Sequence, residues 1–238
     1  MSAVVVAEHV SKQFGAAAAL RDVDLCLENG DRLLLAGANG AGKTTLLRLF
    51  AGLGRPSRGR VLLAGSNPIG FDKRGVGFLS HQSLLYDDLT VGENLVFFGR
   101  LYGLSRICER IDTVLEWMEL GDRLHQRAGT LSRGLKQRLS LARAVLHEPT
   151  LLLLDEPFAS LDRHGVRLLS RYLKAFDNAR TPTTAIIVSH MVEVTADIIN
   201  RVAILRRGRI CLDQTWDGGP GAQLQQLCDR FSEPDGNS

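Results

Sequence analysis

A glycine-rich run followed by a lysine and two threonines is the most informative part of this chain. Residues 37–45 read G-A-N-G-A-G-K-T-T and match the phosphate-binding pattern G-x-x-x-x-G-K-[S/T]. Glycines let successive backbone N–H groups turn toward a polyphosphate, and the positive end of the following helix points at the same place. Lys43 supplies a charge for the β- and γ-phosphates, and the Thr44 hydroxyl can ligate Mg²⁺. The run therefore predicts a nucleoside triphosphate site, formed by Gly37, Ala38, Asn39, Gly40, Ala41, Gly42, Lys43, Thr44 and Thr45.

A second candidate for chemistry is the pair of adjacent acids Asp155 and Glu156, which follows the apolar run Leu151–Leu154. Such a run is typical of a central strand covered on both faces, so the acids would stand at its C-terminal edge, beside the phosphate-binding run. There Asp155 would hold Mg²⁺, directly or through water, and Glu156 would orient or deprotonate an attacking water. Adjacent acids at a strand end often only cap a turn, but the phosphate-binding run favours the catalytic interpretation.

A third segment, residues 131–138, reads L-S-R-G-L-K-Q-R and places Ser132 and the small Gly134 at the start of a helix that continues through Leu139–Leu146. A helix N-terminus is a second position suited to an anion. By itself the segment is only a serine-capped helix, which is a common structural device.

The elements that must position these groups are strands interrupted by one helical stretch. The strand Arg32–Ala36 immediately precedes the phosphate-binding run, so the order is strand, glycine loop, helix. From about Leu84 to Leu146 the apolar spacing is helical instead. The other expected strands are Val4–Val10, Leu20–Leu27, Val61–Ala64, Val76–Leu79, Leu151–Leu154, Ala185–Val188 and a hairpin of Arg201–Leu205 with Ile210–Leu212. The pattern predicts an α/β fold in which an all-helical insertion interrupts a parallel core, with a short helix within residues 217–238.

The candidate residues follow one order along the chain that is typical of a known family. The order is Phe14, residues 37–45, Gln82, residues 131–135, Asp155, Glu156, Ser160-Leu161-Asp162 and His190. Over about residues 3–212 this set resembles the ATP-binding cassette (ABC) family, in which residues 131–135 correspond to the signature, usually written L-S-G-G-Q. Here Arg133 and Leu135 replace its first glycine and its glutamine, while Ser132 and Gly134 are retained. The contact that Arg133 makes stays open.

The resemblance implies a P-loop NTPase core of the ABC type with a parallel sheet, an N-terminal antiparallel β subdomain and an inserted α-helical subdomain. It implies one domain over residues 3–238. Within that domain, residues 3–82 and 148–212 would form the core, residues 83–147 the helical subdomain with the signature, and residues 213–238 a C-terminal tail.

The resemblance also implies roles for residues around the nucleotide. Phe14 would stack on adenine, unless it is a core aromatic. Gln82 would contact Mg²⁺ or the lytic water, and His190 would hydrogen-bond the γ-phosphate and align Glu156. The expected catalytic residues are Lys43, Gln82, Glu156 and His190, and the expected Mg²⁺ ligands are Thr44, Gln82 and Asp155.

A homodimer with two bound ATP molecules is implied as well. Ser132 and Gly134 of one subunit would cap the ATP held by the phosphate-binding run of the other, and Asp162 would reach across the interface. Closing of the dimer would follow ATP binding, and hydrolysis would let it reopen.

Within the family, residues 81–95, H-Q-S-L-L-Y-D-D-L-T-V-G-E-N-L, are similar to the haem-exporter ATPases of cytochrome c maturation. So are residues 36–42 and the S-R-G-x-x-Q-R form of the signature. The expected function is therefore an ATP-binding and ATP-hydrolysing subunit that energises such an exporter at the cytoplasmic face of the bacterial inner membrane, without binding haem itself. A separate integral membrane subunit would dock near residues 83–89. Two alternatives stay open: the ATPase of another exporter, for drugs, polysaccharides or lipids, and a non-transport ABC ATPase.

Composition and charge agree with a globular protein of this kind. The 238 residues are 45% hydrophobic and 23% charged, and the net charge of +3 gives no support to nucleic-acid binding. Met1–His9 lacks a basic start followed by a long apolar stretch, so we expect no signal peptide, and the apolar runs are far shorter than the ~20 residues that span a bilayer. No C-x-x-C pair joins the four cysteines, so we expect free thiols, buried at Cys26 and Cys211.

Overall fold

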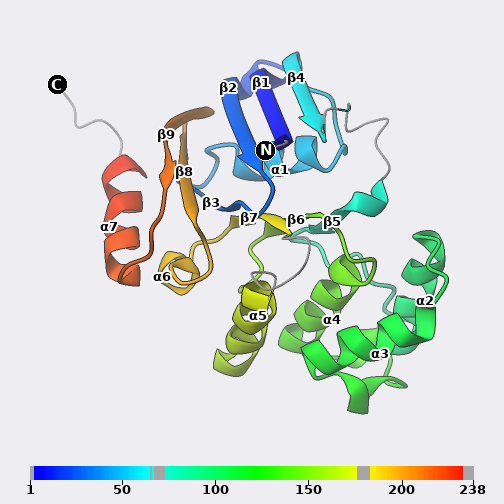
Figure 1. The fold of residues 1–238 in the computed structure, drawn as a ribbon. Coiled ribbons are helices and arrows are strands. Elements are labelled where there is room, and N and C mark those ends of the chain that lie inside the picture. Colours follow the sequence, from blue (N-terminus) through cyan, green and yellow to red (C-terminus); the bar gives the residue numbers. More distant parts are fainter. Residues whose placement is uncertain (1–2, 65, 67–72, 176–182, 233–238) are drawn as a thin grey trace.

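The chain begins with an antiparallel sheet of three strands (Figure 1). The structure is a computed structural model that describes residues 3–64, 66, 73–175 and 183–232. In sheet order the strands are β2 (Ala17–Glu28), β1 (Ala3–Phe14) and β4 (Arg58–Leu63). Val6 in the central strand pairs with Cys26 on one side and Leu62 on the other. Along β2 the side chains alternate, so Leu25 and Leu27 are buried beneath the sheet.

A second sheet of six strands carries the candidate chemistry. In sheet order its strands are β5 (Val76–Leu79), β6 (Leu151–Asp155), β7 (Thr184–Val188), β3 (Arg32–Ala36), β8 (Arg201–Arg206) and β9 (Arg209–Thr215). Neighbouring strands are parallel except at the β8–β9 pair, which is the expected terminal hairpin. The carboxyl ends of the parallel strands therefore lie along one edge.

Both faces of this sheet are buried along β3, β6, β7 and β8, as their continuous apolar runs require, whereas the edge strand β9 is largely exposed. Along β3, Leu33 and Leu35 belong to a core shared with α1 (Lys43–Phe50) and the three-stranded sheet. Leu34 belongs to a second core on the opposite face. Figure 1 shows α5 on the side of the sheet away from β1, β2 and β4.

The inserted helices lie between β5 and β6 in the sequence and to one side of the sheets in space (Figure 1). They are α2 (Val91–Leu101), α3 (Ile107–Met118) and α4 (Arg133–Val145), with 3₁₀ turns at Gly121–Arg123 and Ala128–Thr130. Side-chain caps stand at the start of two of them: Thr90 and Glu93 form a reciprocal capping box at α2, and the Ser132 hydroxyl accepts the N–H of Leu135 at α4. The other helices are α5 (Arg163–Ala175), α6 (Val192–Thr195), α7 (Gly221–Ser232) and the 3₁₀ turn Lys73–Gly75.

The predicted fold class is confirmed, including the antiparallel β subdomain and the helical insertion. The insertion becomes helical at Val91, later than the apolar spacing from Leu84 suggested. The short helix expected in the tail is α7, and the expected frayed end at residues 233–238 lies outside the described residues. Within the described part of the chain, no helix combines the length and apolarity needed to cross a bilayer.

The expected burial of two cysteines is wrong. Cys26 and Cys211 are exposed, because Cys26 has the outward-facing parity of Asp24 on β2 and Cys211 lies on the edge strand β9. The expected free thiols are confirmed for all four cysteines, of which Cys228 is the buried one.

Candidate functional site

The candidate catalytic residues meet where parallel strands end. β3 runs into the phosphate-binding run, β6 ends at Asp155, and β7 ends two residues before His190. β7 lies between β6 and β3, and Asp155 is in register with Val188. Because adjacent parallel strands finish at the same edge, three segments far apart in the sequence form one site. This edge is where open α/β sheets bind ligands.

Two glycines of the phosphate-binding run occupy positions that a larger residue would strain. The φ angles are +140° at Gly37 and +110° at Gly42. A Cβ at Gly37 would lie 2.1 Å from the Leu205 carbonyl oxygen, and a Cβ at Gly42 would lie 2.5 Å from that of Ala19. The run is therefore packed closely against the backbones of β8 and β2, which hold its shape without a ligand.

Lys43 is the first residue of α1, and only 8% of it is exposed. Its Nζ donates hydrogen bonds to the carbonyl oxygens of Gly37 (2.7 Å) and Ala38 (2.9 Å). Burial lowers the pKa of Lys43, while the charges of Glu156 and Asp155 oppose that shift. A phosphate at this loop would offer the amine a stronger, charge-assisted partner than the two carbonyls do.

Thr44 and Asp155 provide an oxygen pair beside the phosphate-binding run. The Thr44 Oγ1 donates to Asp155 Oδ2 at 2.9 Å, although 111 positions separate the two residues. The Asp155 side chain is buried. Hydroxyl and carboxylate oxygens are ligands that Mg²⁺ prefers, so this donor set fits Mg²⁺, and these two residues are the ones that would hold it.

Glu156 and His190 form an acid–base pair next to these oxygens. Glu156 adopts a left-handed φ of +54°, and its N–H donates to the Val188 carbonyl oxygen at 2.8 Å. Its carboxylate accepts the backbone N–H of His190 at 3.2 Å and lies 3.4 Å from the His190 Nε2. A carboxylate held in this way is suited to accept a proton from a water molecule.

A cavity of about 300 Å³ is bounded by these groups. Its lining consists of Ala19, Asn39, Gly40, Ala41, Gly42, Lys43, Thr44, Thr45, His81, Asp155, Glu156, Val188 and His190. The predicted Gln82 is exposed and does not line this cavity, whereas its neighbour His81 does. Sequence reasoning missed His81, since the rotation of a turn decides which of two adjacent side chains points inward.

The signature residues and Asp162 lie near one another but outside this cavity. Gly134 faces the Ser160 carbonyl oxygen, which would lie 3.1 Å from a Cβ at that position. The Asp162 carboxylate accepts the Gly165 N–H at 2.7 Å and lies 3.3 Å from Arg138 Nη2. The Gly165 hydrogen bond and the charge of Arg138 lower the pKa of Asp162. Among the described residues, Ser132, Gly134 and Asp162 do not line this cavity.

Phe14 ends β1 with 59% of its surface exposed, so it is not a core aromatic. The Lys12 Nζ lies 5.1 Å from the centre of its ring. Phe14 does not line the cavity either, and its predicted stacking on adenine stays a prediction.

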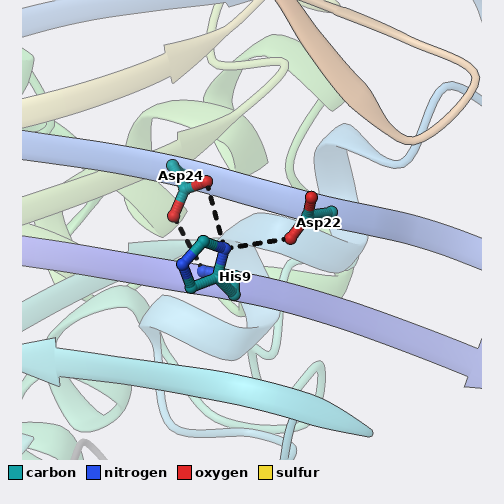
Figure 2. Close-up of side chains that lie close together, drawn as sticks. All are labelled: His9, Asp22 and Asp24. Carbon is teal, nitrogen blue, oxygen red and sulfur yellow. Dashed lines mark hydrogen bonds and ion pairs between the residues drawn. The ribbon is translucent and has the colours of Figure 1, made fainter.

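Figure 2 shows a separate group of possible metal ligands on the N-terminal sheet. His9 Nδ1 lies 3.1 Å from Asp22 Oδ1 and 3.6 Å from Asp24 Oδ2. All three side chains are exposed, and the hydrogen bond that the Asp22 carboxylate accepts, with the charge of Asp24, raises the pKa of His9. An imidazole hydrogen-bonded to Asp22 and close to Asp24 accounts for this geometry, so we assign no metal to it.

The fold and the cavity together define a phosphate-loop nucleotide-binding protein. A family model of ABC transporters matches residues 20–159. The sulfate/thiosulfate import ATP-binding protein CysA of Mesostigma viride is 35% identical over 210 residues, which cover 87% of this chain and 60% of that protein. The ABC transporter ATP-binding protein NatA of Bacillus subtilis is 34% identical over 198 residues, which cover 81% of this chain and 80% of that protein. The chain thus spans about 60% of the length of the CysA relatives it matches.

Solved structures agree with this assignment. An ATP-binding subunit of an ABC transporter superposes with a TM-score of 0.85 at 26% identity, covering 95% of this chain and 99% of the other. A dimeric ATP-binding cassette in a post-hydrolysis state, bound to ADP and Pi, superposes with a TM-score of 0.77 at 26% identity, covering 90% of this chain and 100% of the other. The chain belongs to the ABC transporter family.

Proposed function

We propose that this chain is the ATP-binding and ATP-hydrolysing subunit of a membrane transporter. The observation that carries the proposal is the meeting of Lys43, Thr44, Asp155, Glu156 and His190 around one cavity at the carboxyl edge of the parallel sheet. Hydrolysis of a phosphoanhydride needs groups that bind the phosphates, ligands for a divalent cation and a base that accepts a proton from water. Side chains suited to each of these three roles lie at this edge.

In the proposed reaction each of these groups has a separate role in ATP hydrolysis. Backbone N–H groups of residues 37–45 and the Lys43 amine bind the β- and γ-phosphates. Mg²⁺ held by Thr44 and Asp155 supplies charge neutralisation at the phosphate oxygens when it is bound. Glu156 accepts a proton from the attacking water, and His190 keeps the Glu156 carboxylate in position. Gln82, which is exposed here, would reach the site only after its turn has moved.

We propose a homodimer because part of the expected ATP site lies elsewhere on the same chain. Ser132 and Asp162 are exposed, and Gly134 is half-buried beside the loop that leads to Asp162. A second copy, turned head to tail, would place this surface over the phosphate-binding run of the first and enclose two ATP molecules. The dimeric form of the similar cassette bound to ADP and Pi supports this arrangement.

Trapping of the dimer tests the proposal. Glu156→Gln should bind ATP and Mg²⁺ but hydrolyse ATP only at a small residual rate, so size-exclusion chromatography with light scattering should give twice the monomer mass. ADP without added phosphate serves as the control: it lacks the γ-phosphate that the second subunit would cap, so it should leave the monomer. Ser132→Glu, combined with Glu156→Gln, should prevent dimerisation because it adds a negative charge where the ATP phosphates would lie. A Glu156→Gln protein that stays monomeric with ATP, both alone and with its membrane subunit, contradicts the homodimer.

We infer that the membrane subunit docks at an apolar groove beside the inserted helices. A cavity of about 660 Å³ there is lined by Leu53, Leu84 and Leu101, among others. These three side chains are exposed by 57%, 49% and 68%. Large apolar side chains gathered around an open cavity are typical of a binding surface. Leu84 belongs to residues 83–89, for which the sequence predicts this contact.

For the cargo, we propose a haem exporter of c-type cytochrome biogenesis. Residues 81–95 and the S-R-G-x-x-Q-R form of the signature support it. In this proposal the chain lies at the cytoplasmic face of the bacterial inner membrane and does not bind haem. A second candidate is import of inorganic ions, since relatives are named for sulfate/thiosulfate import and for Fe³⁺ import in Rhodococcus jostii.

Co-purification distinguishes the two candidates. The tagged chain would be extracted from its native membranes after cross-linking, and the attached membrane subunit would be identified by mass spectrometry. A permease of the cytochrome c maturation type is the expected partner. An ion-import permease would overturn the haem proposal. A shift of the haem absorption band on titration into the purified chain alone would contradict the proposal that this chain does not itself bind haem.

A further inference from the structure

Gln137 and Arg138 belong to the signature segment, yet the proposed reaction gives them no part. Gln137 lies in the second turn of α4 and is half-buried. Its Nε2 donates to the carbonyl oxygens of Glu156 at 3.4 Å and of Pro157 at 3.2 Å. The next residue, Arg138, pairs with Asp162 further along the same loop. Two consecutive side chains therefore attach α4 to the segment that follows β6.

Gln137 contacts the backbone of Glu156, whose conformation determines the direction of the Glu156 carboxylate. Glu156 has a left-handed backbone, which costs free energy for a residue other than glycine and must be stabilised by surrounding contacts. On one side its N–H is bonded to Val188 of β7. On the other side its carbonyl oxygen accepts the Ala159 N–H at 3.1 Å and the Gln137 amide. Of these contacts, the one from Gln137 comes from the inserted helical subdomain.

We propose that Gln137 is a positioning residue for Glu156, holding its peptide so that the carboxylate meets His190 and the attacking water. This inference rests on the hydrolytic function proposed above. The helix that carries Gln137 begins at Ser132 and Gly134, the residues expected to cap the partner's ATP. The same contact therefore links the capping of one ATP to the carboxylate that acts on the other.

Gln137→Met tests the proposal, because it keeps the length of the side chain and removes both donor N–H groups. We expect kcat for ATP hydrolysis to fall about tenfold, the effect of losing roughly one hydrogen bond's contribution to the transition state. The KM for ATP should change by less than about twofold, because Gln137 does not line the nucleotide cavity. Gln226→Met, at an exposed glutamine of α7, is the matched control and should leave both constants unchanged.

A double-mutant cycle separates positioning from general structural support. In the Glu156→Gln background the positioned carboxylate is gone, so adding Gln137→Met should lower the residual rate no further. An unchanged kcat in the single variant overturns the proposal, and so does an equal loss in both backgrounds. If Gln137→Met melts well below the parent, Gln137→Glu repeats the comparison with the same size and no donor N–H. A parent protein that hydrolyses no ATP with its membrane subunit refutes the proposed function instead, so the two failures are distinguishable.

Discussion

Burying the charged amine of Lys43 costs folding free energy, while the same charge is expected to strengthen ATP binding. Lys43→Met tests the two effects separately. Methionine keeps the apolar stem of the side chain and removes the charge. In the structure the Lys43 amine donates to two carbonyl oxygens, and 8% of the residue is exposed. Burial lowers its pKa, which means that the folded protein disfavours the charged form.

The magnitudes follow from these contacts. A hydrogen bond from a charged donor contributes about 1.5–3 kcal/mol, but relief of the desolvation of a buried ammonium offsets much of that loss. The Ala38 carbonyl is on an exposed residue, so water can replace the amine there. We expect the free energy of unfolding of the nucleotide-free protein to change by less than about 1 kcal/mol. ATP loses a charged partner of two phosphates, so its Kd should rise by roughly two orders of magnitude.

Titration with a fluorescent ATP analogue measures the Kd, and urea denaturation measures the free energy of unfolding. Lys174→Met is the matched control, since Lys174 is an exposed lysine on α5 that lies 3.8 Å from Asp197. This control should change neither value. An ATP affinity of Lys43→Met within about threefold of the parent refutes the assigned site. A loss of more than about 3 kcal/mol without nucleotide refutes the reasoning about the buried charge.

Two other substitutions test the packing of the phosphate-binding run and the titration of a buried histidine. Gly37→Ala places a Cβ 2.1 Å from the backbone oxygen of Leu205, whereas Gly103→Ala, where φ is also positive, places its Cβ in open space. Urea denaturation should therefore show that Gly37→Ala lowers the free energy of unfolding by at least ~2 kcal/mol more than Gly103→Ala does. Equal losses would contradict the steric argument. Burial lowers the pKa of His147 from its ordinary 6.5 to about 4. The unfolded chain then binds the proton first, so stability that is fully present above pH 6.5 should fall by up to roughly 3 kcal/mol as the pH drops toward 4. His147→Phe, which can keep the stacking on Tyr102, should lose that part of the slope in urea titrations across this range, and an unchanged slope would contradict the assignment.

Local sequence was enough to predict the chemistry of the phosphate-binding run and of the acidic strand end. A glycine loop between a strand and a helix, or an apolar strand followed by acids, can be recognised from residues that are adjacent in the sequence. The bounds of the strands Arg32–Ala36 and Val76–Leu79 were also predicted correctly, because their apolar runs are local features of the sequence. The alternation along β2 also places Cys26 on the outward face with Asp24, although its position within a strand had led us to expect burial.

Tertiary structure alone decided which distant groups touch. The Thr44–Asp155 hydrogen bond depends on the order of β6, β7 and β3 in the sheet. The entry of His81 rather than Gln82 into the cavity depends on the turn that follows β5, and the contact of Gln137 with the Glu156 carbonyl depends on how α4 packs against the core. Such contacts are set by backbone rotations at turns and by packing between segments, and a rotation of one residue reverses the direction of a side chain without changing the sequence pattern.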